Sequence, residues 1–167
     1  MGTLHPGDVG RLGAVIELIA LYHPAGLRIL LGERPPLDAE AWSELIESLR
    51  SKEEPDRVDR SPNLDGFLSK MSDGLCVVEF IERACGWGAV VESAQAFRQT
   101  RPMDWNIFVE FIRSATDPLA SRLQESPLTA AAGEYGVDRK TIYRRRSLVP
   151  VKIAREAIGG FQRALFG

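Results

Sequence analysis

The sequence of 167 residues predicts an all-α protein whose main part is a helical bundle. Apolar residues recur at intervals of three and four along most of the chain, which is typical of amphipathic helices. Residues that favour helix starts precede several of these stretches. No alternation of apolar and polar residues persists long enough to predict a β-strand. These three observations together point to helices packed on helices.

The first predicted helix has apolar residues at helical spacing and ends at a break of sequence His-Pro-Ala-Gly, residues 23–26. Asp38 is the expected N-cap of a second helix. Residues 51–62 follow, with many charges, two prolines and almost no apolar side chains, and are expected to form an exposed loop. The apolar residues of the two helices are Val9, Leu12, Ile16, Ile19 and Ala20, and then Trp42, Leu45, Ile46 and Leu49.

The next stretch looks like the centre of the bundle. Residues 75–85 are apolar on much of the helical circumference, as expected of a central buried helix. A sharp connection is expected at residues 86–88, and a further helix over residues 89–99. Asp104 is expected to cap a third helix, and Asp117, followed by proline, repeats the start signal. The stripe of the third helix is Trp105, Phe108, Val109 and Ile112.

Six aromatic residues belong to these apolar stripes, so we expect them to form core rather than to line a ligand pocket. They are Trp42, Phe80, Trp87, Trp105, Phe108 and Phe111.

Cysteine and histidine are too sparse to predict a metal site. Cys76 and Cys85 are separated by about 13.5 Å if the intervening residues are helical, whereas a disulfide needs Cα atoms within about 7 Å. His5 and His23 do not have zinc-ligand spacing relative to the cysteines. The sequence therefore predicts no disulfide, no metal and no cofactor.

Several functional classes are disfavoured. The sequence has no phosphate-binding loop, no dinucleotide-binding glycine motif, no His-Glu-x-x-His and no nucleophile elbow, so no enzyme is predicted. The acidic residues of the loop do not have the spacing of a calcium loop; they are Glu53, Glu54, Asp56 and Asp59. No signal peptide or membrane-spanning stretch is visible, and a cytoplasmic protein is expected.

Charge divides the chain into two parts. Residues 126–167 hold eight basic and three acidic residues, a net charge of +5, whereas residues 1–125 hold thirteen basic and twenty acidic residues, a net charge of −7. A basic C-terminal part on an acidic body is typical of a polyanion-binding appendage. We therefore divide the chain into an acidic helical body, 1–125, and a basic region, 126–167.

The basic region contains a pattern of two short helices joined by a turn. Ser126 and Pro127 are start signals, and Gly136 supplies the positive φ that ends the first helix. Asp138 is expected to cap a second helix over residues 138–147. The expected small core between the two helices is Ala131 and Ala132, Val137, and Ile142.

The outer face of the second helix is basic and aromatic. At about 100° per residue, Arg139, Lys140, Tyr143 and Arg144 project to one side together with Ser147. Such a helix fits the major groove of B-DNA, where arginine bonds guanine bidentately and lysine reaches guanine or phosphate. We assign base contacts to those first four residues. Phosphate contacts are assigned to Thr129, Arg146, Ser147 and Lys152.

The segment resembles the prokaryotic helix-turn-helix. Leu128, Ala131-Ala132, Gly136-Val137, Thr141-Ile142 and Arg144 follow the pattern at the start of Lac-repressor-type proteins. The run from Gly136 to Arg145 is similar to the C-terminal motif of the Fis and bacterial enhancer-binding proteins and to that of the resolvase/invertase group. The resemblance covers about 20 of the 167 residues and implies that residues 138–147 form a recognition helix, with Ala132, Gly136, Val137 and Ile142 as motif core.

A last amphipathic helix is expected to begin at Pro150, with Gly159-Gly160 weakening it. Its apolar face could dock on the body or pair with a second copy, because periodicity shows a buried face and not its partner. The apolar residues are Val151, Ala154, Ala157, Ile158, Phe161, Leu165 and Phe166.

The sequence thus predicts a nucleoid-associated, sequence-specific double-stranded DNA-binding protein, a transcription regulator of bacterial or phage type. Residues 1–125 would contact RNA polymerase, another regulator or a second copy, and a homodimer would read two half-sites. One alternative is a DNA-packaging recognition subunit or antitermination factor that uses the same motif. Another is a protein-interaction module whose basic hairpin binds an acidic partner instead of DNA.

Overall fold

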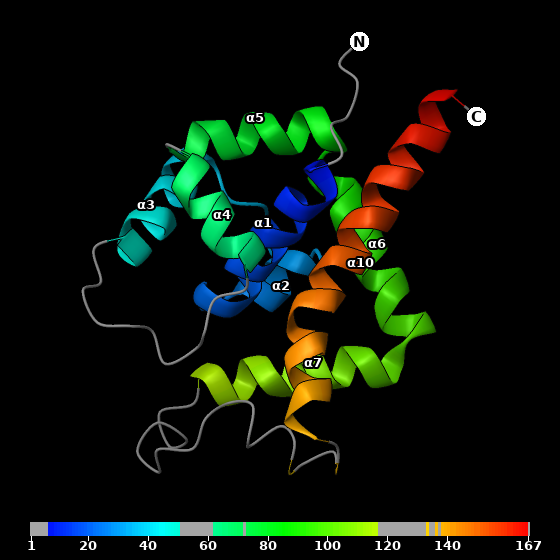
Figure 1. Cartoon of the computed structure of the whole chain (residues 1–167). Helices are drawn as coiled ribbons and strands as arrows, with labels where there is room; N and C mark the ends of the chain where they lie inside the picture. Colours follow the sequence, from blue (N-terminus) through cyan, green and yellow to red (C-terminus); the bar gives the residue numbers. More distant parts are fainter. Residues whose placement is uncertain are drawn as a thin grey trace.

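The computed structural model describes residues 7–50, 62–71, 73–116, 133, 136 and 138–166, without the side chains of residues 62, 63, 114–116, 139–147 and 166. Every regular element in these ranges is an α-helix, so the predicted fold class is confirmed (Figure 1). The helices are α1 (Asp8–Tyr22), α2 (Gly26–Leu30), α3 (Ala39–Arg50), α4 (Pro62–Lys70), α5 (Gly74–Ala84), α6 (Trp87–Thr100), α7 (Pro102–Thr116) and α10 (Arg139–Phe166).

Helix α1 is the centre of the bundle. Every residue from Leu12 to Leu21 is buried, and the helix packs against α2, α4, α5, α7 and α10. Figure 1 shows the other helices arranged around it. The sequence of α1 is apolar almost all round, which is what a helix surrounded on every side requires.

The prediction that residues 75–85 form the central helix is wrong in its position but correct in its secondary structure. Helix α5 is amphipathic: Val77, Phe80 and Ile81 are buried, while Leu75 is 54% exposed. Its outer face also carries charged residues, because α5 covers only one side of the bundle, over α3 and α1. Residues Glu79, Glu82 and Arg83 are exposed there.

Most helix caps and helix ends lie where the sequence predicts them. Asp38 accepts a hydrogen bond at its Oδ1 from the backbone N–H of Ala41, at 2.8 Å, as predicted. Gly86 has a φ of +81°, which is why the connection between α5 and α6 turns sharply. The start predicted at Asp104 is wrong: α7 begins at Pro102, because proline fits the first helical position. Asp104 lies in the first turn instead.

The six aromatic residues are core, as predicted; all are at most 9% exposed. Trp42 of α3 and Trp87 of α6 meet edge to face, with ring centroids 6.4 Å apart. Such pairs contribute roughly 0.5–1.5 kcal/mol beyond the area they bury. The contact therefore helps to join α3 to α6, although the two helices lie far apart in sequence.

A buried carboxylate joins the start of α1 to α5. Asp8 is 1% exposed, with its Oδ2 3.5 Å from Nη1 of Arg83 and its Oδ1 3.4 Å from Nη1 of Arg11. Both arginine side chains are more than a third exposed. The arrangement keeps a buried charge paired, as burial requires.

Helix α10 is one continuous helix of 28 residues with Pro150 inside it. The prediction that a separate last helix begins at Pro150 is therefore wrong. Proline removes one N–H, so the carbonyl of Arg146 loses its usual partner. The helix continues nonetheless, because residues on both sides of Pro150 are held by packing: Val149 and Ile153 are buried in the core.

The second half of α10 docks on its own chain, which decides between the two arrangements left open by its sequence. It packs against α1, α6 and α7. Gly13 of α1 allows a close approach, since a Cβ atom there would lie 3.1 Å from Cγ2 of Val151. The core residues of α10, from residue 149 onward, are Val149, Ile153, Ala154, Ala157 and Ile158.

Candidate nucleic-acid interface

One backbone feature predicted for the segment before α10 is present, the positive φ of Gly136. Gly133 is helical, Gly136 lies in a turn with a φ of +63°, and Asp138 comes directly before the first residue of α10. A φ in this region disfavours residues other than glycine. No atom of the described residues lies within 4 Å of a Cβ built at Gly136, so the constraint that the structure shows there is conformational.

The base-contact residues assigned from the sequence lie on the first turns of α10. Arg139, Lys140, Tyr143 and Arg144 have helical backbone, as do Ile142, Arg146 and Ser147, but the side chains of all seven lie outside the described residues. Also outside them lie Thr129, Ala132 and Val137, His5, the start signal at Asp117, and residues 51–61 of the predicted loop 51–62 with its acidic residues. The end predicted for that loop is wrong at its last residue, because Pro62 is the first residue of α4, a position that suits proline.

Lys152 is the assigned phosphate contact whose side chain is described, and it is half-buried. It lines a groove of about 530 Å³ between α6 and α10. Arg155, exposed on α10, lines the same groove and was missed by the sequence analysis. The signal that could have found it is the spacing of three residues from Lys152, which places both on one side of a helix.

The groove holds four cations and two carboxylates. Arg163 is 3.8 Å from Glu156, and Arg101 is 3.8 Å from Asp104 (Nη to carboxylate oxygen in both pairs). Lys152 and Arg155 make no ion pair with any residue that the structure describes. Their charges are therefore the ones that remain to meet an anion.

On α5 and at its ends, Cys85 and Asp73 have perturbed pKa values. Burial, with a smaller contribution from Glu82, raises the pKa of the Cys85 thiol to about 11, so this cysteine stays protonated and unreactive at neutral pH. Neither Cys76 nor Cys85 forms a disulfide in the part of the chain that the structure describes. Hydrogen bonds from the first turn of α5 lower the pKa of Asp73, its N-cap.

The described ranges contain no group of three or more histidine, cysteine or acidic residues placed to hold a metal ion. No helix in them is long and apolar enough to cross a membrane. Comparisons with protein-family models, with curated protein sequences and with solved structures found no match for this chain. The residues and their geometry are therefore the whole basis for a functional proposal.

Proposed function

We propose that the protein is a sequence-specific double-stranded DNA-binding regulator of transcription, of bacterial or phage type, that places the first turns of α10 in the major groove. The observation that carries the proposal is the position of the basic cluster. Five cations occupy eight residues immediately after the glycine turn; they are Arg139, Lys140, Arg144, Arg145 and Arg146.

The continuity of α10 supports this role. The basic cluster begins the same helix whose second half is buried against α1. Residues 139–148 extend about 15 Å along the helix axis, and the major groove is about 12 Å wide, which admits a helix. A reading element held by a packed core is positioned more precisely than one on a loop.

The charge distribution supports it further. The +5 region meets a polyanion, while the −7 body is repelled from it, and this orients the molecule on DNA. Lys152 and Arg155 would contact phosphates beside the groove that α10 enters, holding the helix in register. The body would then be left to contact RNA polymerase, another regulator or a second copy.

The primary test selects bound duplexes from a random pool and then measures affinity for the selected site. Arg139→Ala and Arg144→Ala should each weaken binding by about 1–3 kcal/mol and relax preference at one base position. Arg98→Ala is the matched control, because Arg98 is exposed on α6 and its loss changes the net charge equally. Equal losses in all three variants, or no selected site at all, would contradict the proposal.

A second measurement separates phosphate contacts from base contacts. Lys152→Gln and Arg155→Gln should weaken binding to all sequences alike. Each should also make the plot of log binding constant against log salt concentration less steep, by about 1 in slope. Arg163→Gln is the control, since Arg163 is paired with Glu156. A sequence-dependent loss in the first two variants would assign them to base reading instead.

The size of the assembly distinguishes regulation from the alternatives. A monomer or dimer fits a regulator, and a dimer should require two half-sites about one DNA turn apart. A large ring would favour a packaging subunit with the same motif. Capture of an acidic protein partner that competing DNA does not displace would favour the interaction module.

A further inference from the structure

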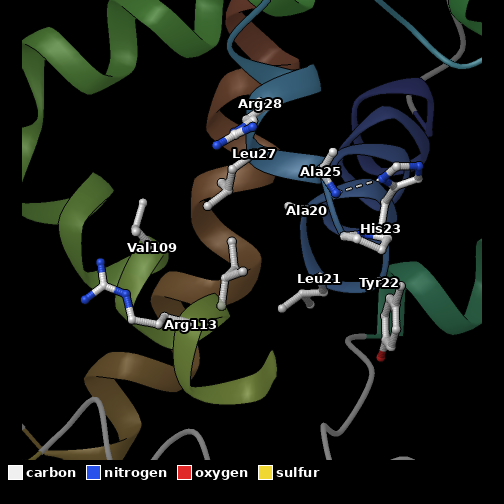
Figure 2. A pocket seen from close by; sticks show the side chains of 12 residues that line it. Ala20, Leu21, Tyr22, His23, Ala25, Leu27, Arg28, Val109 and Arg113 are labelled. Carbon is white, nitrogen blue, oxygen red and sulfur yellow. Dashed lines mark hydrogen bonds between the residues drawn. The ribbon is translucent and has the colours of Figure 1, made fainter. Parts of the chain in front are cut away.

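A second concave site lies among α1, α2 and α7. It has a volume of about 570 Å³, within the range of small-molecule sites. Figure 2 shows Leu21, Leu27 and Val109 around the hollow. Ala20 and Ile112 complete its apolar lining. A site of this size and composition suits a ligand with an apolar body.

The rim of this pocket is cationic. Arg28 of α2 and Arg113 of α7 both line it, and none of the described lining residues is acidic (Figure 2). Arg113 is partly offset by Glu110, whose Oε2 is 3.2 Å from its Nη1. Arg28 is exposed and makes no ion pair with any residue in the described ranges. An unpaired guanidinium beside an apolar hollow is suited to bidentate binding of a carboxylate.

His23 adds no positive charge to the pocket at neutral pH. Its Nδ1 accepts a hydrogen bond from the backbone N–H of Ala25, at 3.0 Å, which requires the unprotonated nitrogen. Burial, together with the charge of Arg34, lowers the pKa of His23 below its ordinary value. The polar part of a ligand is therefore directed to Arg28 rather than to the imidazole.

We propose that this pocket binds a small apolar carboxylate, with its hydrocarbon part against Leu21, Leu27 and Val109 and its carboxylate on Arg28. This site is separate from the proposed DNA interface and does not depend on it. Because α7 forms one wall and packs on α10, a bound ligand would contact the element that holds α10 in place.

The test uses three eight-carbon probes that share a tail and differ in their head group: octanoate, octan-1-ol and octylamine. Binding to the full-length protein is followed by isothermal titration and by methyl chemical shifts of Leu21, Leu27, Val109 and Ile112. Octanoate should bind and shift these methyls. The alcohol should bind roughly tenfold more weakly, because it lacks the charge-assisted hydrogen bonds, and the amine should not bind measurably.

Two variants separate the contribution of the Arg28 charge to binding from that of the hollow itself. Arg28→Gln should weaken octanoate binding roughly tenfold and leave octanol binding unchanged. Val109→Trp should block both, because the indole fills the hollow; its thermal melting verifies that it folds. Arg98→Gln, on α6, is the charge-matched control and should change neither affinity.

Equal affinity of octanoate and octanol, or of octanoate for the wild type and Arg28→Gln, would overturn the proposal. So would chemical shift changes confined to another surface. Since Arg28 is exposed, its replacement is expected to leave the fold intact, and that variant alone keeps the proposal testable if Val109→Trp does not fold.

Discussion

Gly74 begins α5 where this helix meets α3, and it has no room for a side chain. A Cβ atom there would lie 1.8 Å from the carbonyl oxygen of Ala39 and 2.6 Å from the backbone nitrogen of Ser43. The N–H of Gly74 also donates to Oγ of Ser43, at 2.7 Å. The contact atoms belong mainly to backbone, so they cannot move aside as the end of a flexible side chain could.

Gly74→Ala should therefore lower the free energy of unfolding by about 3 kcal/mol or more, as overpacking against backbone does. Gly66→Ala is the matched control, because Gly66 is inside α4 and a Cβ there meets no atom within 4 Å. That variant should be more stable by about 1 kcal/mol through helix propensity. Urea denaturation measures both, and similar effects of the two substitutions would refute the steric argument.

His23 makes stability depend on pH, because burial and the nearby charge of Arg34 disfavour its protonated form in the folded protein. The pKa of His23 is lowered in the folded protein from an ordinary value of 6.5. The unfolded chain therefore binds a proton first as pH falls. The contribution is present in full above about pH 6.5 and is lost as the pH decreases from there toward the lowered pKa.

The measurement is the free energy of unfolding between about pH 5 and 8, compared with His23→Asn. Asparagine can accept the same backbone hydrogen bond without titrating. The wild-type protein should lose stability relative to the variant below about pH 6.5, and the two curves should run parallel above it. A constant difference across this range would show that His23 does not titrate differently in the two states.

Some features of the helices follow from nearby residues and could be predicted, whereas others depend on which elements pack against the helix. The helix starting after Asp38 was predictable because a side-chain oxygen caps a nearby N–H. The short helix α2 and helix α4 were not identified, because short apolar patterns next to prolines carry little periodic signal. The role of α1 as central helix depends on which helices surround it, and this is not a local property.

The two proposed sites also differ in how far the sequence predicts them. The turn at Gly136 and the helix after Asp138 follow from residue chemistry, so the sequence identified their positions. The pocket between α1, α2 and α7 could not be predicted, because Leu21 and Val109 are far apart in sequence and each resembles an ordinary core position. Which apolar residues leave a hollow is decided only when the helices pack.

Pro150 should be a source of instability within α10. Pro150→Ala restores an N–H for the carbonyl of Arg146, a gain of about 3 kcal/mol in a helix interior. It also removes about two buried methylenes, each contributing about 0.8 kcal/mol. The net expectation is an increase of about 1–2 kcal/mol in the free energy of unfolding.

Val151→Ala is the neighbouring control, since it removes a similar volume without adding a hydrogen-bond donor, and it should lower stability. Denaturant unfolding of both variants gives the comparison. If Pro150→Ala were as destabilising as Val151→Ala, the packing of the proline ring would outweigh the missing hydrogen bond.

For the whole molecule, α10 connects the proposed DNA-binding residues to the core of the body. The division at residue 126 predicted from charge assigns Val149, Ile153 and Ala157 to the basic part, yet these residues are at most 1% exposed and pack with α1. Charge and packing thus divide the chain differently. The body without α10 would expose the apolar face of α1, including Gly13 and the residues near it.

A chain that ends at residue 138 should therefore fail to fold cooperatively, because several buried side chains of about 1–3 kcal/mol each are lost together. Circular dichroism melting and binding of a hydrophobic dye measure this directly. A chain lacking only residues 162–167 is the control, since the described side chains there are exposed. It should melt close to the full-length protein. A sharp melting transition at an unchanged temperature in the chain that ends at residue 138 would mean that the body is stable without α10. The boundary drawn from charge would then also be the boundary of the fold.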